Sequence, residues 1–299
     1  MKKSGYIANH VFNKVEKLIE KKMKKAELSL FLTHLHGDTI EYWDNQKDLP
    51  VLLLLHGFGA RTKYQWFKQV EFLSKDYRLI LPNLIHFGNS TSPKEDVGVS
   101  DQVEMVENLL TSLGIEFFTT MGVSYGGLVG IELAQKNKMK IEQLIIVNSP
   151  IKFMLKEDIT NVCNRFNVTT VEDLFVPESP KGLKKMWHLS SGKKIYLPDF
   201  VFNEFYNRMY AGNRESKRKL MQNLIDSLET FAQHEYNFGI ETLLIWSDDD
   251  MIIPVQRGRL LKKYLGKKAE LHIIQKGGHM VNLNKTKEFN RILMRFLLS

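Results

Sequence analysis

The chain has 299 residues, of which 43% are hydrophobic and 25% are charged, as is ordinary for a soluble globular protein. Its length allows one α/β domain with an insertion or two small domains. The single cysteine, Cys163, excludes an intramolecular disulfide, and the longest aliphatic run, residues 51–55, is far too short to cross a bilayer. Because no apolar stretch follows the first lysines, we expect no signal peptide and, by default, a cytoplasmic location.

Residues 1–27 are predicted to form a basic amphipathic helix that holds much of the net charge of +8. Its apolar residues recur at helical spacing, and lysines lie between them at positions 14, 17, 21, 22, 24 and 25. Such a helix can make peripheral contact with an anionic membrane, or it can pack on the domain with a solvated lysine face. No nucleic-acid-binding signature accompanies the charge, so we expect no nucleic-acid partner.

Strand and helix patterns alternate along the next 120 residues. An alternating segment, residues 28–45, predicts a hairpin that turns at His36-Gly37-Asp38. Further strands are predicted at 51–55, 77–81, 117–121 and 143–147, and helical patterns at 66–73, 103–113 and 128–134. This alternation is typical of a mostly parallel, doubly wound sheet.

The alternation stops between residues 151 and 235, a segment with helical patterns, three prolines and many aromatic residues. Strand patterns return at 242–246 and 270–274, and an amphipathic helix with Phe289, Ile292 and Phe296 ends the chain. We therefore predict a core of residues 28–150 and 236–299 with an inserted helical cap, 151–235. Aromatic cap residues are candidates for the wall of a substrate pocket, namely Trp187, Phe202 and Tyr206.

The run Gly122-Val123-Ser124-Tyr125-Gly126 has the G-x-S-x-G spacing between a predicted strand and a predicted helix. A serine in such a tight turn has strained backbone angles, and its neighbours at the glycine positions must lack bulky side chains. The strain exposes the hydroxyl, and the following helix directs backbone N–H groups at a negative charge that forms there. Ser124 is therefore the candidate nucleophile.

An acyl-transfer serine needs a base and a carboxylate that orients the base, each just after a strand. His279 follows the last predicted strand after two glycines, and Asp250 follows the strand 242–246. The neighbouring Asp248 and Asp249 make the choice of acid ambiguous on chemistry alone, since either could cap a turn or helix. The other strand end where the acid could sit has Asn148 and no carboxylate, which favours the later loop.

Donors for the oxyanion are predicted in His56-Gly57-Phe58-Gly59, directly after the first buried strand. We expect the backbone N–H of Phe58 to act together with that of Tyr125. His56 is expected to brace the loop and not to act as a second base.

Together these runs resemble the α/β-hydrolase superfamily, as do the strand-end Trp246, Pro254 and Gly277-Gly278-His279. The similarity extends from about residue 42 to the end of the chain and is nearest to carboxylesterases, monoacylglycerol-lipase-like enzymes and carbon–carbon-bond hydrolases. It implies an α/β-hydrolase fold in which Ser124, Asp250 and His279 form the triad and Phe58 and Tyr125 supply the oxyanion donors. Relatives with haloalkane dehalogenase or epoxide hydrolase chemistry use aspartate where Ser124 stands.

The segment 82–90 resembles the superfamily's P-D-x-x-G-x-G-x-S loop with two departures. Asn83 replaces the acid and His86 replaces a glycine. A separate run, His34-Leu35-His36-Gly37-Asp38, is similar to the metal motif of metallo-β-lactamase-like hydrolases but lacks its final histidine. We expect neither a metal nor a cofactor.

The predicted function is hydrolysis of an apolar or amphipathic acyl ester, a small molecule, by a Ser124-Asp250-His279 triad. One alternative is hydrolytic cleavage of a carbon–carbon bond in a diketone-like substrate by the same triad. Another is a small-molecule sensor on the same fold that does not turn over, because a fold alone does not determine function. The oligomeric state is left open.

Overall fold

The computed structural model describes residues 2–59, 61–137, 140–192, 196–237 and 239–298, without side-chain detail for residues 2–6 and 8. The described strands form one eight-stranded sheet in the order β1-β2-β4-β3-β5-β6-β7-β8. The pairings β1–β2 and β2–β4 are antiparallel, and all others are parallel. The strands are β1 (Ser29–Leu35), β2 (Asp38–Asp44), β3 (Val51–Leu55), β4 (Arg78–Pro82), β5 (Phe118–Val123), β6 (Ile141–Val147), β7 (Glu241–Ser247) and β8 (Ala269–Ile274).

The helices in the first half of the chain are α1 (Lys2–Lys25), α2 (Thr62–Trp66), α3 (Val70–Leu73), α4 (Val99–Ser112) and α5 (Tyr125–Lys136). Those between β6 and β7 are α6 (Lys156–Phe166), α7 (Val171–Phe175), α8 (Pro180–Ser191), α9 (Asp199–Met209), α10 (Arg214–Asp226) and α11 (Leu228–Gln233). The last are α12 (Val255–Leu265), α13 (Val281–Asn284) and α14 (Thr286–Leu297), and a 3₁₀ turn, Gly266–Lys268, precedes β8.

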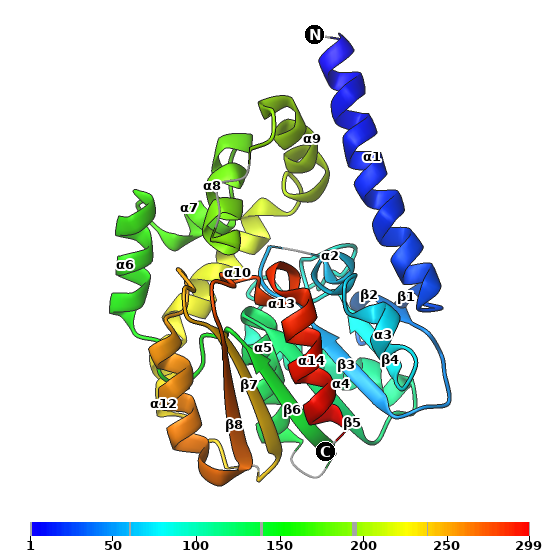
Figure 1. The fold of residues 1–299 in the computed structure, drawn as a ribbon, viewed down its shortest axis with the longest axis vertical. Coiled ribbons are helices and arrows are strands. Elements are labelled where there is room, and N and C mark those ends of the chain that lie inside the picture. Colours follow the sequence, from blue (N-terminus) through cyan, green and yellow to red (C-terminus); the bar gives the residue numbers. More distant parts are fainter. Residues whose placement is uncertain (1, 60, 138–139, 193–195, 238, 299) are drawn as a thin grey trace.

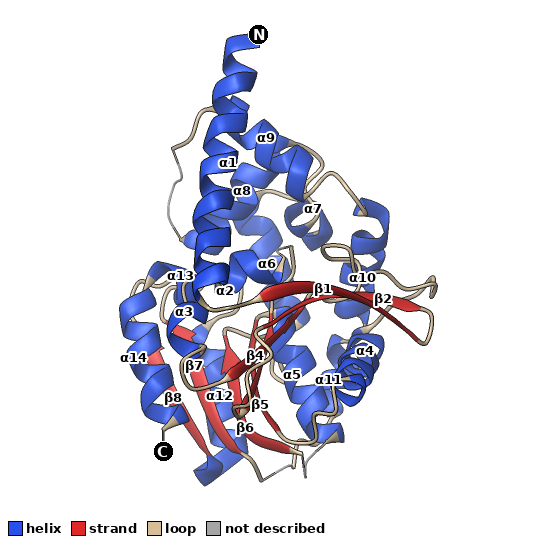
Figure 2. Ribbon diagram, turned by 90° about the vertical axis from the view of Figure 1, so that its right-hand side faces the viewer, coloured by secondary structure: helices blue, strands red, loops and turns tan. Residues whose placement is uncertain are grey.

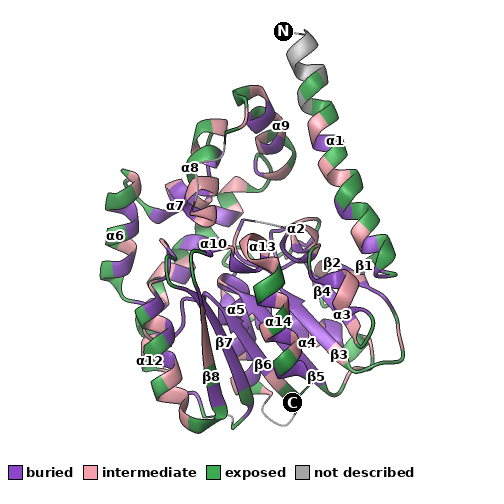
Figure 3. Ribbon diagram, viewed as in Figure 1, coloured by how far each residue is buried: buried purple, intermediate pink, exposed green. Residues whose placement is uncertain are grey.

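Two apolar layers cover the sheet, because successive side chains of a strand point to opposite faces. Leu53 and Leu55 belong to the layer that also contains apolar residues of α4, α5 and α12, whereas Leu52 and Leu54 belong to the layer that contains apolar residues of α1, α3 and α14. Figure 2 shows α3 and α14 on one side of the strands, and α4, α5 and α11 on the other. Figure 3 shows that the central strands are buried. The predicted doubly wound, mostly parallel sheet is confirmed.

The helices α6 to α9 gather beyond one end of the sheet, and α1 runs from beside β1 and β2 past α9 (Figure 1). The range 151–235, for which a cap is predicted, contains α6 to α11. Residues 193–195 of that range, and residue 1 of the predicted N-terminal helix, lie outside the described residues. None of the described helices combines the length and apolarity needed to cross a membrane.

The helical pattern predicted at 66–73 is divided between α2 and α3. Asn282 Nδ2 donates a hydrogen bond to the Gln65 carbonyl at 2.8 Å. In an unbroken helix this carbonyl would instead accept the N–H of Gln69. The Gln69 N–H bonds the carbonyl of Trp66 instead. A distant side chain therefore tightens this turn, a contact that the local pattern does not contain.

Candidate active site

Ser124 lies in the turn between β5 and α5 with φ 53° and ψ −121°. The left-handed φ is costly for a residue with a side chain, and the surrounding packing maintains it. A Cβ atom on Gly122 would lie 2.1 Å from the Gly126 carbonyl oxygen, and one on Gly126 would lie 2.4 Å from that of Leu55. The two glycines of the motif are therefore sterically required. The Ser124 hydroxyl makes no hydrogen bond with another described residue, and it lines a pocket.

His279 and Asp250 come from the loops after β8 and β7, and His279 Nδ1 lies 2.8 Å from Asp250 Oδ2. Their side chains are 4% and 0% exposed. The other carboxylate oxygen, Asp250 Oδ1, accepts the backbone N–H groups of Ile252 at 2.8 Å and Ile253 at 3.0 Å. These bonds fix the carboxylate so that it accepts the Nδ1 proton and leaves Nε2 free as the basic nitrogen.

The two neighbouring acids have other roles. Asp249 accepts the Ser247 hydroxyl at 2.6 Å and the Gly278 N–H at 2.7 Å, and Asp248 accepts the Lys276 N–H at 2.7 Å. Both stabilise the loop that ends at His279, and neither contacts its imidazole. Of the three carboxylates, Asp250 is therefore the one that hydrogen-bonds to His279.

Asn148, at the end of β6, has a structural role that its place in the sequence did not predict. Its Nδ2 donates to the His279 carbonyl at 2.8 Å, and its Oδ1 accepts the Ser247 N–H at 3.0 Å. It is fully buried and has a left-handed backbone, φ 43°. The amide therefore ties the end of β6 to the loops that carry Asp250 and His279. The one feature of the sequence that could have indicated this role is its position at the end of a predicted strand.

The loop after β3 carries Phe58, whose ring packs against that of Tyr125 with centroids 5.9 Å apart. The backbone N–H groups of these two residues donate to no other described residue, and Tyr125 is the first residue of α5. They are available to an oxyanion.

His56 begins this loop, and its Nδ1 lies 2.8 Å from the Gly57 carbonyl oxygen while its Nε2 accepts the Leu84 N–H at 3.0 Å. Complete burial lowers the pKa of His56 to about 4, so the neutral ring braces the loop, as expected.

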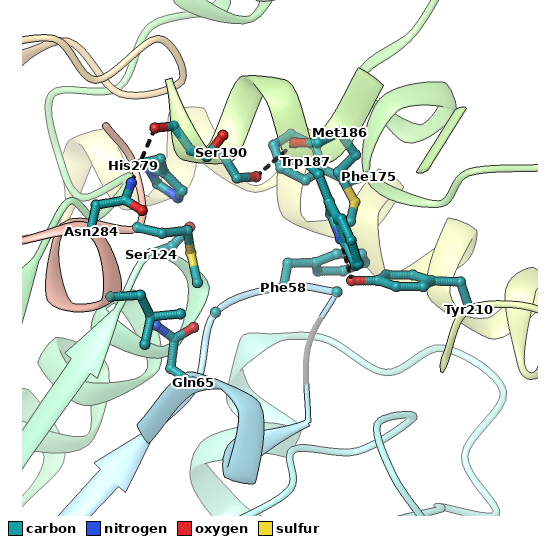
Figure 4. A pocket seen from close by; sticks show the side chains of 15 residues that line it. Phe58, Gln65, Ser124, Phe175, Met186, Trp187, Ser190, Tyr210, His279 and Asn284 are labelled. Carbon is teal, nitrogen blue, oxygen red and sulfur yellow. Dashed lines mark hydrogen bonds between the residues drawn. The ribbon is translucent and has the colours of Figure 1, made fainter. Parts of the chain in front are cut away.

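A pocket of about 220 Å³ opens at Ser124 and His279. Figure 4 shows Ser124, His279 and Asn284 on one side of it and Phe175, Trp187 and Tyr210 on the other. Of the three aromatic residues predicted for its wall, Trp187 lines it. Phe202 lies behind Trp187, with ring centroids 5.4 Å apart, and the Tyr206 hydroxyl donates to the Glu178 carbonyl, so both lie outside the lining.

A second cavity of about 50 Å³ meets the first at Phe58, Ser124 and Phe175. Its walls are mostly aliphatic, with three aromatic residues, Phe58, Tyr125 and Phe175. They come mainly from α6, α7, α10 and α11 and from the loop after β7, which supplies Ile253. The serine therefore stands where a larger, partly polar pocket joins a small apolar one. The helical patterns predicted in residues 151–235 did not indicate that side chains from this segment meet at Ser124.

Comparison with known proteins agrees with this fold. Residues 50–286 match the family model described as the alpha/beta hydrolase fold. The chain is 26% identical to Lipase 3 of Moraxella sp. over 281 residues, which cover 92% of this chain and 87% of the lipase. It is 25% identical to the putative carbamate hydrolase RutD of Agrobacterium fabrum over 260 residues, 84% of this chain and 94% of RutD.

Among solved structures, the 2-hydroxy-6-oxo-6-phenylhexa-2,4-dienoate hydrolase of Rhodococcus sp. superposes with a TM-score of 0.77 at 18% identity, covering 91% of this chain and all of that one. The fold and the serine turn define an α/β-hydrolase architecture. The chain belongs to the alpha/beta hydrolase fold family.

Proposed function

We propose that the protein is a serine hydrolase that cleaves acyl esters with apolar or amphipathic groups. The observation that carries this proposal is the buried Asp250–His279 hydrogen bond of 2.8 Å. His279 lines a pocket that is also lined by Ser124, which lies in its strained turn. Such an arrangement supplies the nucleophile, the base and the orienting acid of acyl transfer. Similarity to lipases supports ester hydrolysis, in which a small-molecule ester is the partner and no cofactor takes part.

The mechanism follows from the atoms that face the pocket. Ser124 Oγ attacks the ester carbonyl carbon while His279 Nε2 takes the hydroxyl proton, and Asp250 stabilises the resulting imidazolium. The N–H groups of Phe58 and Tyr125 donate hydrogen bonds to the tetrahedral oxyanion. The ester C–O bond then breaks, and His279 returns the proton to the leaving alcohol oxygen. Water repeats the sequence on the acyl-enzyme, releasing the acid and restoring the Ser124 hydroxyl.

The lining of the two cavities supports an apolar substrate with a short chain on one side of the reacting carbonyl. Apart from Ser124 and the hydroxyl group of Tyr125, the side chains that line the small cavity are apolar, and its size suits a short aliphatic group. The larger pocket mixes Trp187 and Met186 with the polar side chains of Gln65 and Asn284. It suits a bulkier group that has a polar end.

An active-site fluorophosphonate tests the chemistry. We expect stoichiometric labelling of the wild type and none of Ser124→Ala, with Ser190→Ala, a serine that lines the same pocket, as a matched control that keeps the label. A series of p-nitrophenyl esters should turn over continuously, with a preference for short acyl chains. Labelling that persists in Ser124→Ala would contradict the proposal. Turnover of a vinylogous diketone, but not of esters, would favour carbon–carbon cleavage, and labelling without turnover would favour a sensor.

We also propose that α1 attaches the enzyme peripherally to an anionic membrane. Lys14, Lys17, Lys21 and Lys24 are exposed and make no ion pair with a described residue, whereas Lys22 and Lys25 pair with Glu71. Leu18 is 53% exposed among the free lysines. Each lysine near a charged bilayer contributes about 1 kcal/mol to binding.

Charge reversal is a better test than deletion, because α1 also packs on α9 and α3. We expect the wild type to co-sediment with phosphatidylserine vesicles at low salt and the triple variant Lys14→Glu, Lys17→Glu, Lys21→Glu to remain in the supernatant. Neither protein should co-sediment with uncharged phosphatidylcholine vesicles. Equal sedimentation of both proteins with the anionic vesicles would refute the proposal without affecting the esterase assay.

A further inference from the structure

A third cavity, of about 100 Å³, lies behind the loop that carries Phe58 and is strongly basic. Its described lining includes Arg61, His86, Arg208 and Lys217, and no described lining residue is acidic. The proposed hydrolytic mechanism uses none of these side chains. Basic side chains around one small cavity repel one another when they are charged, so an occupant of opposite charge would relieve the repulsion.

Lys217 is the most buried of the three basic residues that carry a charge at neutral pH, with 9% of its surface exposed. Its Nζ donates to the Gly212 carbonyl at 3.3 Å, lies 5.6 Å from the centre of the Phe87 ring, and forms no ion pair in the described part of the chain. Burial, and to a smaller degree the charge of Arg61, lower the pKa of Lys217 to about 8. A buried lysine without an acidic partner destabilises the fold unless a ligand supplies the missing charge.

His86 is 9% exposed, and its ring nitrogens bond to no described residue. Its backbone has φ 76°, a left-handed conformation that a residue with a Cβ adopts only at a cost. This is the position at which the superfamily loop has a glycine. The chain therefore keeps an imidazole on the cavity at a conformational cost that a glycine would avoid.

Arg61 and Arg208 differ in whether an acidic side chain pairs with their positive charge. Arg208 bonds Glu204 and Asn9, whereas Arg61 is half-buried and makes no ion pair with a described residue. The thirteen-residue helix α10 also begins at this cavity, which Asn213 lines. The N-terminus of a helix adds partial positive charge and free N–H groups.

We propose that Arg61, His86 and Lys217 form a binding site for an oxyanion, either a carboxylate or a phosphate group. Gly59 lines both this cavity and the pocket at Ser124. The Phe87 ring beneath Lys217 packs edge-to-face on Phe58 at 5.2 Å. The site is thus next to the proposed oxyanion donor. Its occupant is either an acidic group of the substrate or a free anion.

Titration with inorganic phosphate, at an ionic strength held constant with sodium chloride, tests the site directly. We expect phosphate to bind the wild type and to raise its Tm. Binding should be at least tenfold weaker in Arg61→Gln and in Lys217→Met. Lys219→Met, on the exposed face of α10, is the matched control and should bind like the wild type. Without phosphate, Lys217→Met should melt at a higher temperature than the wild type because the unpaired buried charge is gone.

The proposal is overturned if phosphate has no effect beyond that of chloride, or if Lys219→Met weakens binding as much as Lys217→Met. If Lys217→Met does not fold, Arg61→Gln decides the matter, because the Arg61 side chain has no described hydrogen bond. Ser124→Ala should bind phosphate normally, so failure of the proposed hydrolase function would leave this result intact.

Kinetics then separate the two sources of the anion. If the group belongs to the substrate, a p-nitrophenyl monoester of a dicarboxylic acid should have a lower KM than its neutral methyl diester. Phosphate should then compete with the acid, and Arg61→Gln should raise KM for the acid alone. If the anion is free, phosphate should change kcat for the neutral ester, and both esters should respond equally to Arg61→Gln. Both results support an oxyanion site.

Discussion

The Nδ1 atom of His279 lies 2.8 Å from Oδ2 of Asp250, and the two side chains are almost completely excluded from solvent. This one bond joins the loops after β8 and β7 and determines which nitrogen of the imidazole is free. Because the carboxylate also accepts two backbone N–H groups, it is held in place before a substrate arrives. The expected effects of substitutions around it follow from that arrangement.

Replacing Asp250 with asparagine should lower kcat for a p-nitrophenyl ester by about 10³- to 10⁴-fold while KM changes little. The uncharged amide no longer stabilises the imidazolium or selects the tautomer with a proton on Nδ1. Asp248→Asn is the matched control and should keep most of the activity, since the Asp248 carboxylate accepts the backbone N–H of Lys276 and makes no hydrogen bond to His279 in the described part of the chain. Comparable losses in the two variants would argue against Asp250 as the acid.

Removal of the Asn148 amide should destabilise the protein by about 2 kcal/mol, because the substitution Asn148→Ala leaves the buried Ser247 N–H and His279 carbonyl without partners. Urea unfolding measures the loss. As a positioning residue, Asn148 should also affect kcat more than KM. The effect on kcat is compared with that of Ser149→Ala at the neighbouring position, which removes a hydrogen bond to the Ser124 carbonyl. A wild-type kcat in Asn148→Ala would show that the brace does not position His279.

Acidification should destabilise the fold through His56, whose pKa burial lowers from 6.5 to about 4. Between these two values the unfolded chain binds a proton at this residue and the folded chain does not, so stability falls as pH decreases through that window. The loss reaches up to about 3 kcal/mol near pH 4. Urea unfolding of the wild type and of His56→Gln at pH 7 and pH 4.5 measures it. The variant should lose less stability, and equal losses would exclude His56 as the source.

Shortening Phe12 to alanine should loosen the contact between α1 and the helices over the pocket. Phe12 is 4% exposed and packs on Phe205 with centroids 4.9 Å apart, and Phe205 packs in turn on Trp187 in the pocket wall. Loss of the ring should cost about 3 kcal/mol of local stability and raise KM. Hydrogen exchange of α9 measures the first effect. Leu18→Ala, at an exposed position, should change neither, and unchanged exchange in Phe12→Ala would contradict this coupling.

The predictable part of the fold came from local patterns. Buried runs such as residues 51–55, and the hairpin that turns at Gly37, appear in the structure as β3 and as β1 with β2. Each of these depends on side-chain periodicity or on a turn residue, which a short window of sequence contains. The division of the predicted helix 66–73 could not be foreseen, since it depends on Asn282, more than 200 residues away.

The two departures in segment 82–90 have structural explanations that the sequence did not contain. Asn83 Oδ1 accepts the Thr62 N–H at 2.8 Å, and its Nδ2 donates to the buried carboxylate of Glu41 on β2 at 2.5 Å. A carboxylate is therefore still present beside this loop, and it is the side chain of Glu41 on β2. His86 lines the basic cavity. Both roles depend on residues that the chain brings together only on folding.

The sequence by itself determined the family, the serine turn and the order in which the candidate nucleophile, acid and base follow one another, because each depends on residue types at fixed short spacing. The tertiary structure places Asp250 against His279, as the resemblance implied. It alone decided that Trp187 but not Phe202 lines the pocket, and that Arg61, His86 and Lys217 share one cavity. These outcomes depend on distances between separate elements, which packing sets and no local pattern encodes.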